Sequence, residues 1–339
     1  MRNFCTLFDK NYLPYGVALH ASLMRWHARP FRLYMLAMDE TCERALRVLQ
    51  LENVVVVSLE EVVTPDLAWI HGRMSFGQIC WTSQPLLCRH VLDRCGAEEV
   101  TYLEADSYFF ADPQLLFDEI GTRSVSLVPH RYSPGFDQTA VSGVFCVQFN
   151  LFRNDAPGRE LLAIWEQACL LYDKQRGLWY PGQVCMDSWP ERSSAVCVVQ
   201  HKGAGVGPWN VPGSRIGQRD GHPTVDDQPV VFFHFHQVAR MDDGRYYVSN
   251  YPLGQAAIDL FYRPYLAELE RQRRMLSTRI PNFDHFRSYC PPRLWSSLLS
   301  FDPTQWRAYR AYLGIRATRR RNFIRSEVTP SPSIPQGAR

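Results

Sequence analysis

One stretch constrains the fold of this chain more than any other, because it places two acidic residues directly after an apolar run. Val100–Asp112 reads VTYLEADSYFFAD. Its first four residues are typical of a short strand that is buried on both faces of a sheet. Open α/β sheets bind ligands at the carboxyl ends of such strands. Glu104 and Asp106 stand at that end, so the sequence predicts an α/β fold with a ligand site at these carboxylates.

Glu104 and Asp106 are separated by one residue on the predicted strand-to-loop turn. Two carboxylates so placed can converge on one hard cation, and a cation there can hold a diphosphate. Two solvated acids in a loop, or acids that cap the next helix, would produce the same pattern. The pair alone leaves these interpretations open.

The residues before this stretch alternate between strand and helix patterns. Apolar runs predict strands at 4–8, 31–38 and 54–59, and apolar spacing of three and four predicts helices at 16–27 and 41–51. This order predicts a parallel sheet with right-handed crossovers.

The rest of the chain continues the alternation and then changes. Helices are predicted at 85–95, 115–120 and 160–172, and strands at 124–128, 143–149, 195–200 and 230–236. After about residue 254 the pattern is helical, most clearly at 258–275. The last residues are rich in Pro and Ser, which predicts a disordered tail.

Composition excludes several classes of protein. The 339 residues carry a net charge of +3, which indicates no nucleic-acid partner. The ten cysteines are irregularly spaced and contain no CxxC pair, a pattern typical of a reducing compartment. No apolar window reaches the roughly 18 residues needed to span a membrane. We therefore expect a cytoplasmic protein.

Six further motifs accompany VTYLEADSYFFAD. They are FCTLFDKNY (4–12), PHRYSP (129–134), GVFCVQF (143–149), GQVCMDSWPER (182–192), QHKGAGVGPWN (200–210) and FFHFHQ (232–237). In this order the set resembles the GT-A fold glycosyltransferases, which are nucleotide-diphospho-sugar transferases. Within them the chain is similar to bacterial members distantly related to glycogenin-like enzymes. The resemblance covers about residues 3–237 and implies a mostly parallel GT-A sheet with flanking helices.

The resemblance implies a divalent cation, Mn²⁺ or Mg²⁺, held by the paired acids and a histidine. Glu104 and Asp106 match the acids of the family motif, and Asp106 matches it directly. His234 aligns best with the family histidine, and His236 shares its face of the strand by alternation. His201 is a rival candidate, and either strand histidine could instead be a hydrogen-bonded core residue.

The resemblance also implies donor contacts. The nucleoside would be held by residues of the first motif, namely Thr6, Asp9, Asn11 and Tyr12. Further substrate or nucleotide contacts are expected at Arg131, Gln148, His201 and Trp209. Catalytic roles are expected at Asp187, Gln183 and Lys202. Each also has a purely structural interpretation, such as a polar turn at Asp9 or a cap at Asp187.

Three polar positions depart from the family pattern. Glu104 replaces Asp, Cys146-Val147-Gln148 replaces Asn-x-Gly, and Gly182 replaces the leading Asp of its motif. Cys cannot make the amide hydrogen bonds of Asn. These changes fit either a different donor sugar and metal geometry or a homologue that has lost activity.

The function implied is a hexosyltransferase that moves a sugar from a nucleotide-diphosphate-sugar donor, expected to be a UDP-sugar, to a carbohydrate or lipid-linked acceptor in polysaccharide biosynthesis. The alternative is a diverged, non-catalytic GT-A homologue that binds nucleotide or glycan or acts as a scaffold. A third hypothesis is a nucleotidyltransferase on a similar sheet. No Walker or Rossmann glycine motif follows the first strand, which argues against kinases and dehydrogenases.

Three segments are expected in the domain organisation. Residues 1–253 would form the GT-A domain, 254–326 a helical extension and 327–339 the disordered tail. The basic run 316–325 could contact the inner face of an anionic membrane, which would suit a lipid-linked acceptor. A solvated helix end has the same composition.

Overall fold

The computed structural model describes residues 1–63, 74–170, 181–288 and 323–325. The predicted N-terminal alternation of strands and helices is confirmed. Its elements are β1 (Arg2–Phe8), α1 (Leu13–Trp26), β2 (Phe31–Ala37), α2 (Glu40–Leu49) and β3 (Val54–Ser58). β1 pairs in parallel with β2, and β2 pairs in parallel with β3.

The middle of the chain carries the opening stretch as two short strands. Its elements are α3 (Leu59–Val62), α5 (Phe76–Arg94), β4 (Glu99–Leu103), β5 (Ser107–Phe109), α6 (Gln114–Ile120), β6 (Val125–Pro129), α7 (Thr139–Ser142), β7 (Phe145–Cys146), β8 (Phe149–Arg153) and α8 (Ala156–Leu170). β4 is buried along its whole length, as the apolar pattern predicts.

The remaining described elements are shorter until the last helix. They are α9 (Pro181–Val184), η2 (Cys185–Ser188), α10 (Trp189–Arg192), β9 (Val196–Val198), η3 (Val211–Gly213), β10 (Ile216–Arg219), β11 (His222–Val225), β12 (Gln228–Pro229), β13 (Phe232–His234), β14 (Ala239–Arg240), β15 (Arg245–Tyr247), α11 (Gln255–Ala257), η4 (Ile258–Tyr262), α12 (Arg263–Arg279) and β16 (Phe323–Arg325).

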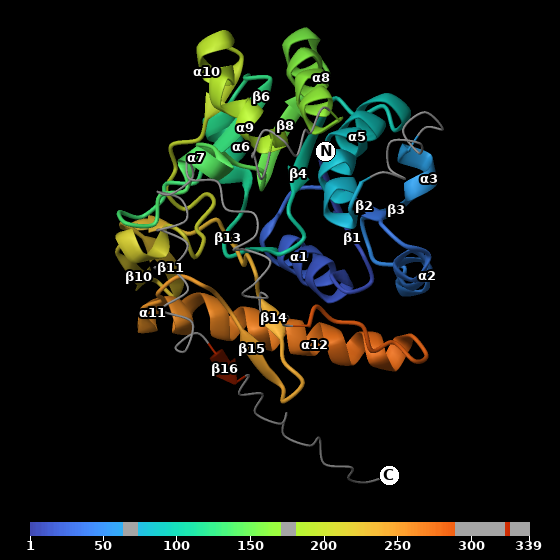
Figure 1. The fold of residues 1–339 in the computed structure, drawn as a ribbon, viewed down its shortest axis with the longest axis vertical. Helices are drawn as coiled ribbons and strands as arrows, with labels where there is room; N and C mark the ends of the chain where they lie inside the picture. Colours follow the sequence, from blue (N-terminus) through green and yellow to red (C-terminus); the bar gives the residue numbers. More distant parts are fainter. Residues whose placement is uncertain (64–73, 171–180, 289–322, 326–339) are drawn as a thin grey trace, which may run out of the picture.

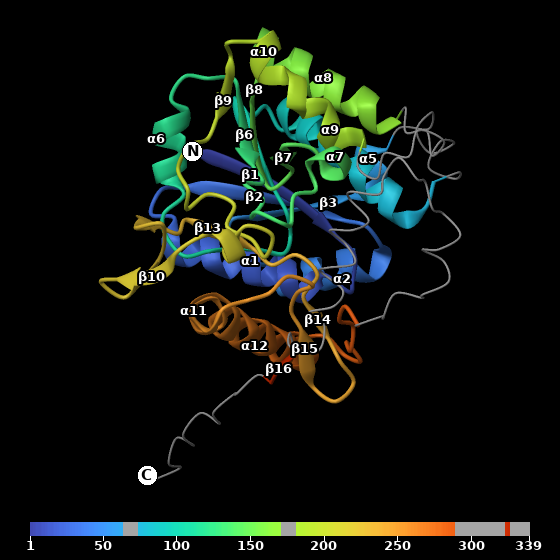
Figure 2. The same cartoon turned by 60° about the vertical axis from the view of Figure 1, so that its left-hand side comes forward.

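The central sheet has the strand order β3-β2-β1-β4-β8-β6-β7, with β9 paired to β6. Strands β3, β2, β1 and β4 are parallel, whereas β8 runs antiparallel to both β4 and β6. Helices cover both faces (Figures 1 and 2). α5 and α8 pack on one face around Tyr102 and Trp165, and α1, α2 and α6 pack on the other around Phe4.

Two sequence predictions of local structure were wrong in their bounds. The apolar run 143–149 was expected to be one strand, but it divides into β7 and β8 because the chain turns at 147–148, where the Gln148 N–H donates to Asn150 Oδ1 at 3.0 Å. The helix expected at 85–95 begins at Phe76, where Ser75 and Gln78 form a capping box. Pro85 therefore lies inside the helix.

The C-terminal helices lie against the sheet domain. α12 runs beneath α1 in Figure 1, and its residues Tyr265 and Leu269 share a core cluster with Phe233 and Phe235 of the β13 region. The predicted helical pattern after residue 254 is confirmed as far as Arg279. The domain boundary at 253 stays a prediction, and the tail at 327–339 and most of the basic run lie outside the described residues. No helix in the described ranges combines the length and apolarity needed to cross a bilayer.

Candidate functional site

The pairing of β13 with β5 brings the histidine motif to the acidic stretch. The two strands run antiparallel, and His234 stands opposite Ser107. The Phe235 N–H donates to the main-chain oxygen of Asp106 at 2.8 Å. The turn after β4 and the end of β13 are thus held together by backbone hydrogen bonds. This arrangement fixes where the acidic and imidazole side chains meet.

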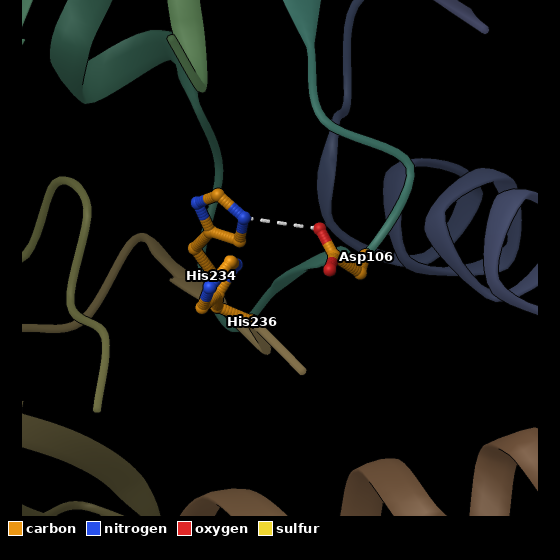
Figure 3. Close-up of side chains that lie close together, drawn as sticks. All are labelled: Asp106, His234 and His236. Atoms are coloured by element: carbon orange, nitrogen blue, oxygen red, sulfur yellow. Dashed lines mark ion pairs between the residues drawn. The ribbon is translucent and has the colours of Figure 1, made fainter. Parts of the chain in front are cut away.

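Asp106, His234 and His236 form a cluster in which one ligand atom from each residue lies within 4.8 Å of the others. Figure 3 shows the His234 ring directed at the Asp106 carboxylate with His236 beside it. His234 Nε2 lies 3.0 Å from Asp106 Oδ1. We call these three side chains the Asp-His-His cluster. The structure therefore brings together three of the four predicted metal ligands.

The electrostatics of the cluster are those of a buried ion pair. Burial opposes ionisation of Asp106, but the His234 charge and hydrogen bond outweigh it and lower the carboxyl pKa to about 2. Burial likewise opposes protonation of His234, yet Asp106 holds its pKa well above the ordinary value. Burial and then repulsion from His234 lower the pKa of His236 to about 4. In this structure a proton on His234 Nε2 bridges to Asp106. A metal ion at the cluster would replace that proton.

Glu104 does not belong to the Asp-His-His cluster. Its Oε1 instead accepts a hydrogen bond from Gln84 Nε2 at 2.9 Å. Burial, followed by repulsion from Asp106, raises the pKa of Glu104 to about 8. The longer Glu side chain therefore forms part of the surroundings of the cluster in this structure, and its predicted role as a ligand stays a prediction.

The far side of the His234 ring contacts Gln148 and Cys146. His234 Nδ1 lies 3.1 Å from Gln148 Oε1 and 3.9 Å from Cys146 Sγ. Gln148 is fully buried, so this predicted substrate contact is placed behind His234. Cys146 occupies the position where the family has Asn, and it too lies against the imidazole. The departure at 146–148 therefore lies next to the cluster.

Trp209 forms a wall of the cluster. Its ring centroid lies 5.2 Å from that of His234 and 6.2 Å from that of His236. The indole Nε1–H donates to the main-chain oxygen of His130 at 2.8 Å, which fixes the ring orientation. Trp209, which belongs to the motif at 200–210, therefore packs against the cluster. Its predicted contact with substrate stays a prediction.

The predicted nucleoside turn follows β1 and lies near the same cluster. Asp9 Oδ1 accepts from the N–H groups of Asn11 and Tyr12, both at 3.0 Å, and Asn11 Nδ2 donates to Asp9 Oδ2 at 2.8 Å. Asp9 and Asn11 therefore build the turn. The buried Thr6 hydroxyl has no hydrogen-bond partner among the described residues. Burial raises the pKa of Tyr12, and the charges of Asp106 and Glu104 add to this increase. The Tyr12 side chain packs against the apolar cluster that contains Phe235.

Three basic residues that were expected to contact substrate or take part in catalysis already have partners within the protein. Lys202 Nζ pairs with Asp226 at 2.7 Å. The Arg131 guanidinium donates to the main-chain oxygens of Val199 at 2.6 Å and Ala204 at 2.8 Å. His201 Nδ1 accepts from the Gly203 N–H at 3.1 Å. These contacts hold the loop at 199–204. The substrate contacts predicted for Arg131 and His201 and the catalytic role predicted for Lys202 stay predictions.

The two remaining catalytic candidates fasten the segment that carries Cys146. Asp187 Oδ1 accepts from the Val144 N–H at 2.8 Å. Gln183 Oε1 accepts from the Val147 N–H at 3.2 Å, and its Nε2 donates to the Ser142 main-chain oxygen. Both side chains therefore have structural partners, and their catalytic roles stay predictions.

Sequence reasoning missed two residues near the site. Gln84 of α5 binds Glu104, and its position within a helix gave no motif to mark it. Arg287 follows α12, and its guanidinium carbon lies 5.2 Å from the centroid of the Tyr12 ring. It belongs to a segment with no recognised motif, so only the tertiary structure places it here.

Gly182 replaces the leading Asp of the family motif, and it lies where neighbouring side chains pack closely. A Cβ at Gly182 would overlap Cys169 Sγ and lie 3.4 Å from Trp165 Nε1. We expect Gly182→Asp to destabilise the protein by about 3 kcal/mol, because overpacking adds to the burial of a charge, rather than to restore the family carboxylate. Urea unfolding would measure this loss.

A double-mutant cycle provides the control for that prediction. Cys169→Ala removes the overlapping sulfur, so Gly182→Ala should cost less stability in the Cys169→Ala background than in the wild type. Equal costs in both backgrounds, or a Gly182→Asp variant as stable as the wild type, would show that packing against Cys169 does not exclude a side chain.

No model of a known protein family matches the chain. The chain is 30% identical over 269 residues to the uncharacterized protein YfnD of Bacillus subtilis, an alignment that covers 76% of this chain and 85% of YfnD. It is also 27% identical over 247 residues to the uncharacterized protein YfnF of the same organism, covering 68% of this chain and 80% of YfnF.

The fold is similar to that of the galactosyltransferase LgtC in complex with donor and acceptor sugar analogues. The TM-score is 0.50 at 14% identity, and the match covers 87% of this chain and 99% of LgtC. The likeness concerns the fold, and it confirms the GT-A type sheet with flanking helices that the motifs imply. The chain therefore belongs to the family of YfnD and has the GT-A fold of the nucleotide-diphospho-sugar transferases.

Proposed function

We propose that this chain is a metal-dependent glycosyltransferase that moves a sugar from a nucleotide-diphosphate-sugar, a UDP-sugar in the first instance, to a carbohydrate or lipid-linked acceptor. The observation that carries this proposal is the Asp-His-His cluster, which lies next to the Tyr12 turn on a GT-A fold. A carboxylate and two imidazoles beside a nucleoside-binding turn are suited to hold the diphosphate of such a donor.

The donor set fits a divalent transition-metal ion. Asp106 supplies a carboxylate oxygen, and His234 and His236 supply imidazole nitrogens. Imidazole ligands favour transition metals over Mg²⁺, which prefers oxygen ligands and retained water. We therefore favour Mn²⁺ over Mg²⁺. When bound, the ion would neutralise charge on the departing nucleoside diphosphate.

Gln148 orients His234 for this role. With Nδ1–H donating to Gln148 Oε1, the Nε2 atom is left to face Asp106. Metal-binding histidines are usually held in this way by an acceptor on the other ring nitrogen. The amide-containing motif 146–148 thus supports the cluster from behind.

A ligand screen tests the proposal. Each common nucleoside diphosphate and UDP-sugar is added with and without Mn²⁺, and the melting temperature is measured. A ligand at about 100 times its Kd should stabilise the protein by about 2.7 kcal/mol, a shift of several degrees. If no nucleotide, nucleotide-sugar or metal shifts the transition, the proposal is wrong. Release of nucleoside diphosphate from the donor supports a transferase, and release of pyrophosphate indicates a nucleotidyltransferase.

The absence of an acid at Gly182 favours the alternative of a non-catalytic homologue, because the packing leaves no room for the family carboxylate. The two functions differ in turnover. A transferase hydrolyses or transfers its donor sugar at a measurable rate, whereas a binding module shows the same Mn²⁺-dependent donor binding and no product.

The support from Gln148 can be measured. Gln148→Met has a similar shape but no acceptor for His234 Nδ1–H, and loss of such a partner typically weakens metal affinity by about 10- to 100-fold. Gln148→Glu keeps an acceptor and should retain more of the affinity. Mn²⁺ titration followed by thermal stability reports both values. Equal Mn²⁺ affinity in Gln148→Met and the wild type would contradict this role.

A further inference from the structure

The segment after α12 returns to the sheet domain beside the predicted nucleoside turn. The Phe286 ring packs against two tyrosines, with its centroid 5.1 Å from that of Tyr15 and 5.9 Å from that of Tyr246. The Arg240 N–H of β14 donates to the main-chain oxygen of Arg287 at 2.9 Å, and Arg240 also forms a parallel bridge with Ser288. The main chain on both sides of the Arg287 side chain is therefore held against the domain.

Arg287 directs its guanidinium toward the Tyr12 turn. The guanidinium carbon lies 5.2 Å from the centroid of the Tyr12 ring, within cation–π range. The positive charge of Arg287 also acts on the Asp-His-His cluster. The pKa of Asp106 is governed by burial and then by His234, and Arg287 is among the groups that lower it. Burial and His234 lower the pKa of His236, and Arg287 adds to that effect.

Arg287 differs from the other cations near the site because its guanidinium has neither an ion pair nor a hydrogen bond among the described residues. Lys202 is paired with Asp226, and Arg131 donates to main-chain oxygens of its loop. Across 1–63, 74–170, 181–288 and 323–325, no carboxylate forms an ion pair with Arg287. A half-buried, unpaired guanidinium is costly to desolvate and is well suited to bind a ligand anion.

We propose that Arg287 binds the diphosphate of the nucleotide-sugar donor from the segment that follows α12. The proposal rests on the proposed function, because it requires a nucleotide in this site. A nucleoside on Tyr12 and a metal ion at Asp106 and His236 would place a diphosphate between them. The Arg287 guanidinium lies over the Tyr12 ring, and its charge acts on Asp106. A guanidinium can donate two parallel hydrogen bonds to phosphate oxygens.

The test compares Arg287→Gln and Arg287→Lys with the wild type. The probes are the nucleoside diphosphate that stabilises the wild type most in the screen above, the matching nucleoside without phosphates, and Mn²⁺ alone. Arg287→Gln should lower the affinity for the nucleoside diphosphate by about 10- to 100-fold, the range expected for loss of hydrogen bonds from a charged group. It should leave the nucleoside and Mn²⁺ affinities within about threefold of the wild type. Arg287→Lys keeps a point charge and should lose less affinity.

Arg219→Gln is the matched control, because Arg219 is exposed on β10 in a hairpin that carries none of the candidate ligands. It should leave all three affinities unchanged. The melting temperature of each variant without ligand shows whether the fold is retained. If Arg287→Gln does not fold, the affinities of Arg287→Lys are compared with those of the wild type instead.

Three outcomes would overturn the inference. If the wild type binds no nucleoside diphosphate, both this inference and the proposed function are wrong. If the wild type binds one and Arg287→Gln binds it equally well, only the inference is wrong. If Arg287→Gln lowers the affinities for the nucleoside and for its diphosphate by the same factor, Arg287 supports Tyr12 and does not bind phosphate.

Discussion

Replacing Asp106 by Asn should abolish the stabilisation of this protein by Mn²⁺ and lower any sugar-transfer rate by about 10³-fold. Asp106 is the carboxylate of the Asp-His-His cluster, and His234 Nε2 lies 3.0 Å from it. Asn has nearly the same shape but no negative charge, so the anionic metal ligand and the charged partner of His234 are lost. Bound metal contributes several kcal/mol to a charge-forming transition state, and each 1.36 kcal/mol is a factor of ten in rate.

Asp220→Asn is the control for this substitution. Asp220 is exposed in the turn between β10 and β11 with a φ of 50°, a conformation that Asn tolerates. We expect Mn²⁺ binding and any sugar transfer by this variant to equal those of the wild type. Calorimetric titration of Mn²⁺ and an assay of released nucleoside diphosphate measure the two effects. Undiminished Mn²⁺ binding by Asp106→Asn would mean that the metal, if any, binds elsewhere.

The second large effect is expected on stability. A Cβ at Gly203 would overlap the main-chain oxygen of Pro229 and lie 2.9 Å from His201 Cε1. The Val231 N–H donates to the Gly203 main-chain oxygen at 2.9 Å, so the two backbones are held in contact. Backbone cannot yield as a flexible side chain does. We expect Gly203→Ala to cost about 3 kcal/mol and to lower the melting temperature by about 5 °C.

Gly77→Ala makes the same chemical change where there is space. Gly77 lies in the first turn of α5, and nothing approaches a Cβ there within 4 Å. Ala is favoured over Gly in a helix by up to about 1 kcal/mol, so this variant should be as stable as the wild type or slightly more so. If thermal unfolding shows Gly203→Ala to be as stable as Gly77→Ala, the loop can move away from Pro229.

A loss of stability in Gly203→Ala would also indicate what the glycines of the motif QHKGAGVGPWN (200–210) do. Glycines in such a loop can let the backbone approach a ligand closely. In the structure Gly203 faces Pro229, Gly205 faces Gln148 and Gly207 faces the Trp209 ring. Their missing side chains allow the loop to pack closely on the protein and, through Gln148 and Trp209, to support the cluster.

The sequence by itself determined the sheet and the place of its acids. Strand and helix periods are local properties, so the alternation from β1 to β3 and the buried strand β4 could be predicted from them. The position of Asp106 at a strand end follows from the same local pattern. The ordered motifs added the GT-A fold, which the comparison with LgtC confirms.

The tertiary structure alone decided which side chains meet. The antiparallel pairing of β13 with β5 brings His234 and His236 to Asp106, whereas Glu104 turns to Gln84 of α5. Hydrogen bonding and ion pairing across the fold also determined which cations have partners. Lys202 forms an ion pair with an acid, whereas Arg287 forms none within the part of the chain that the structure describes. The ordered motifs implied that a histidine joins the acids, but Gln84 and Arg287 belong to no motif. Their contacts depend on residues far apart in the chain, so no local period predicts them.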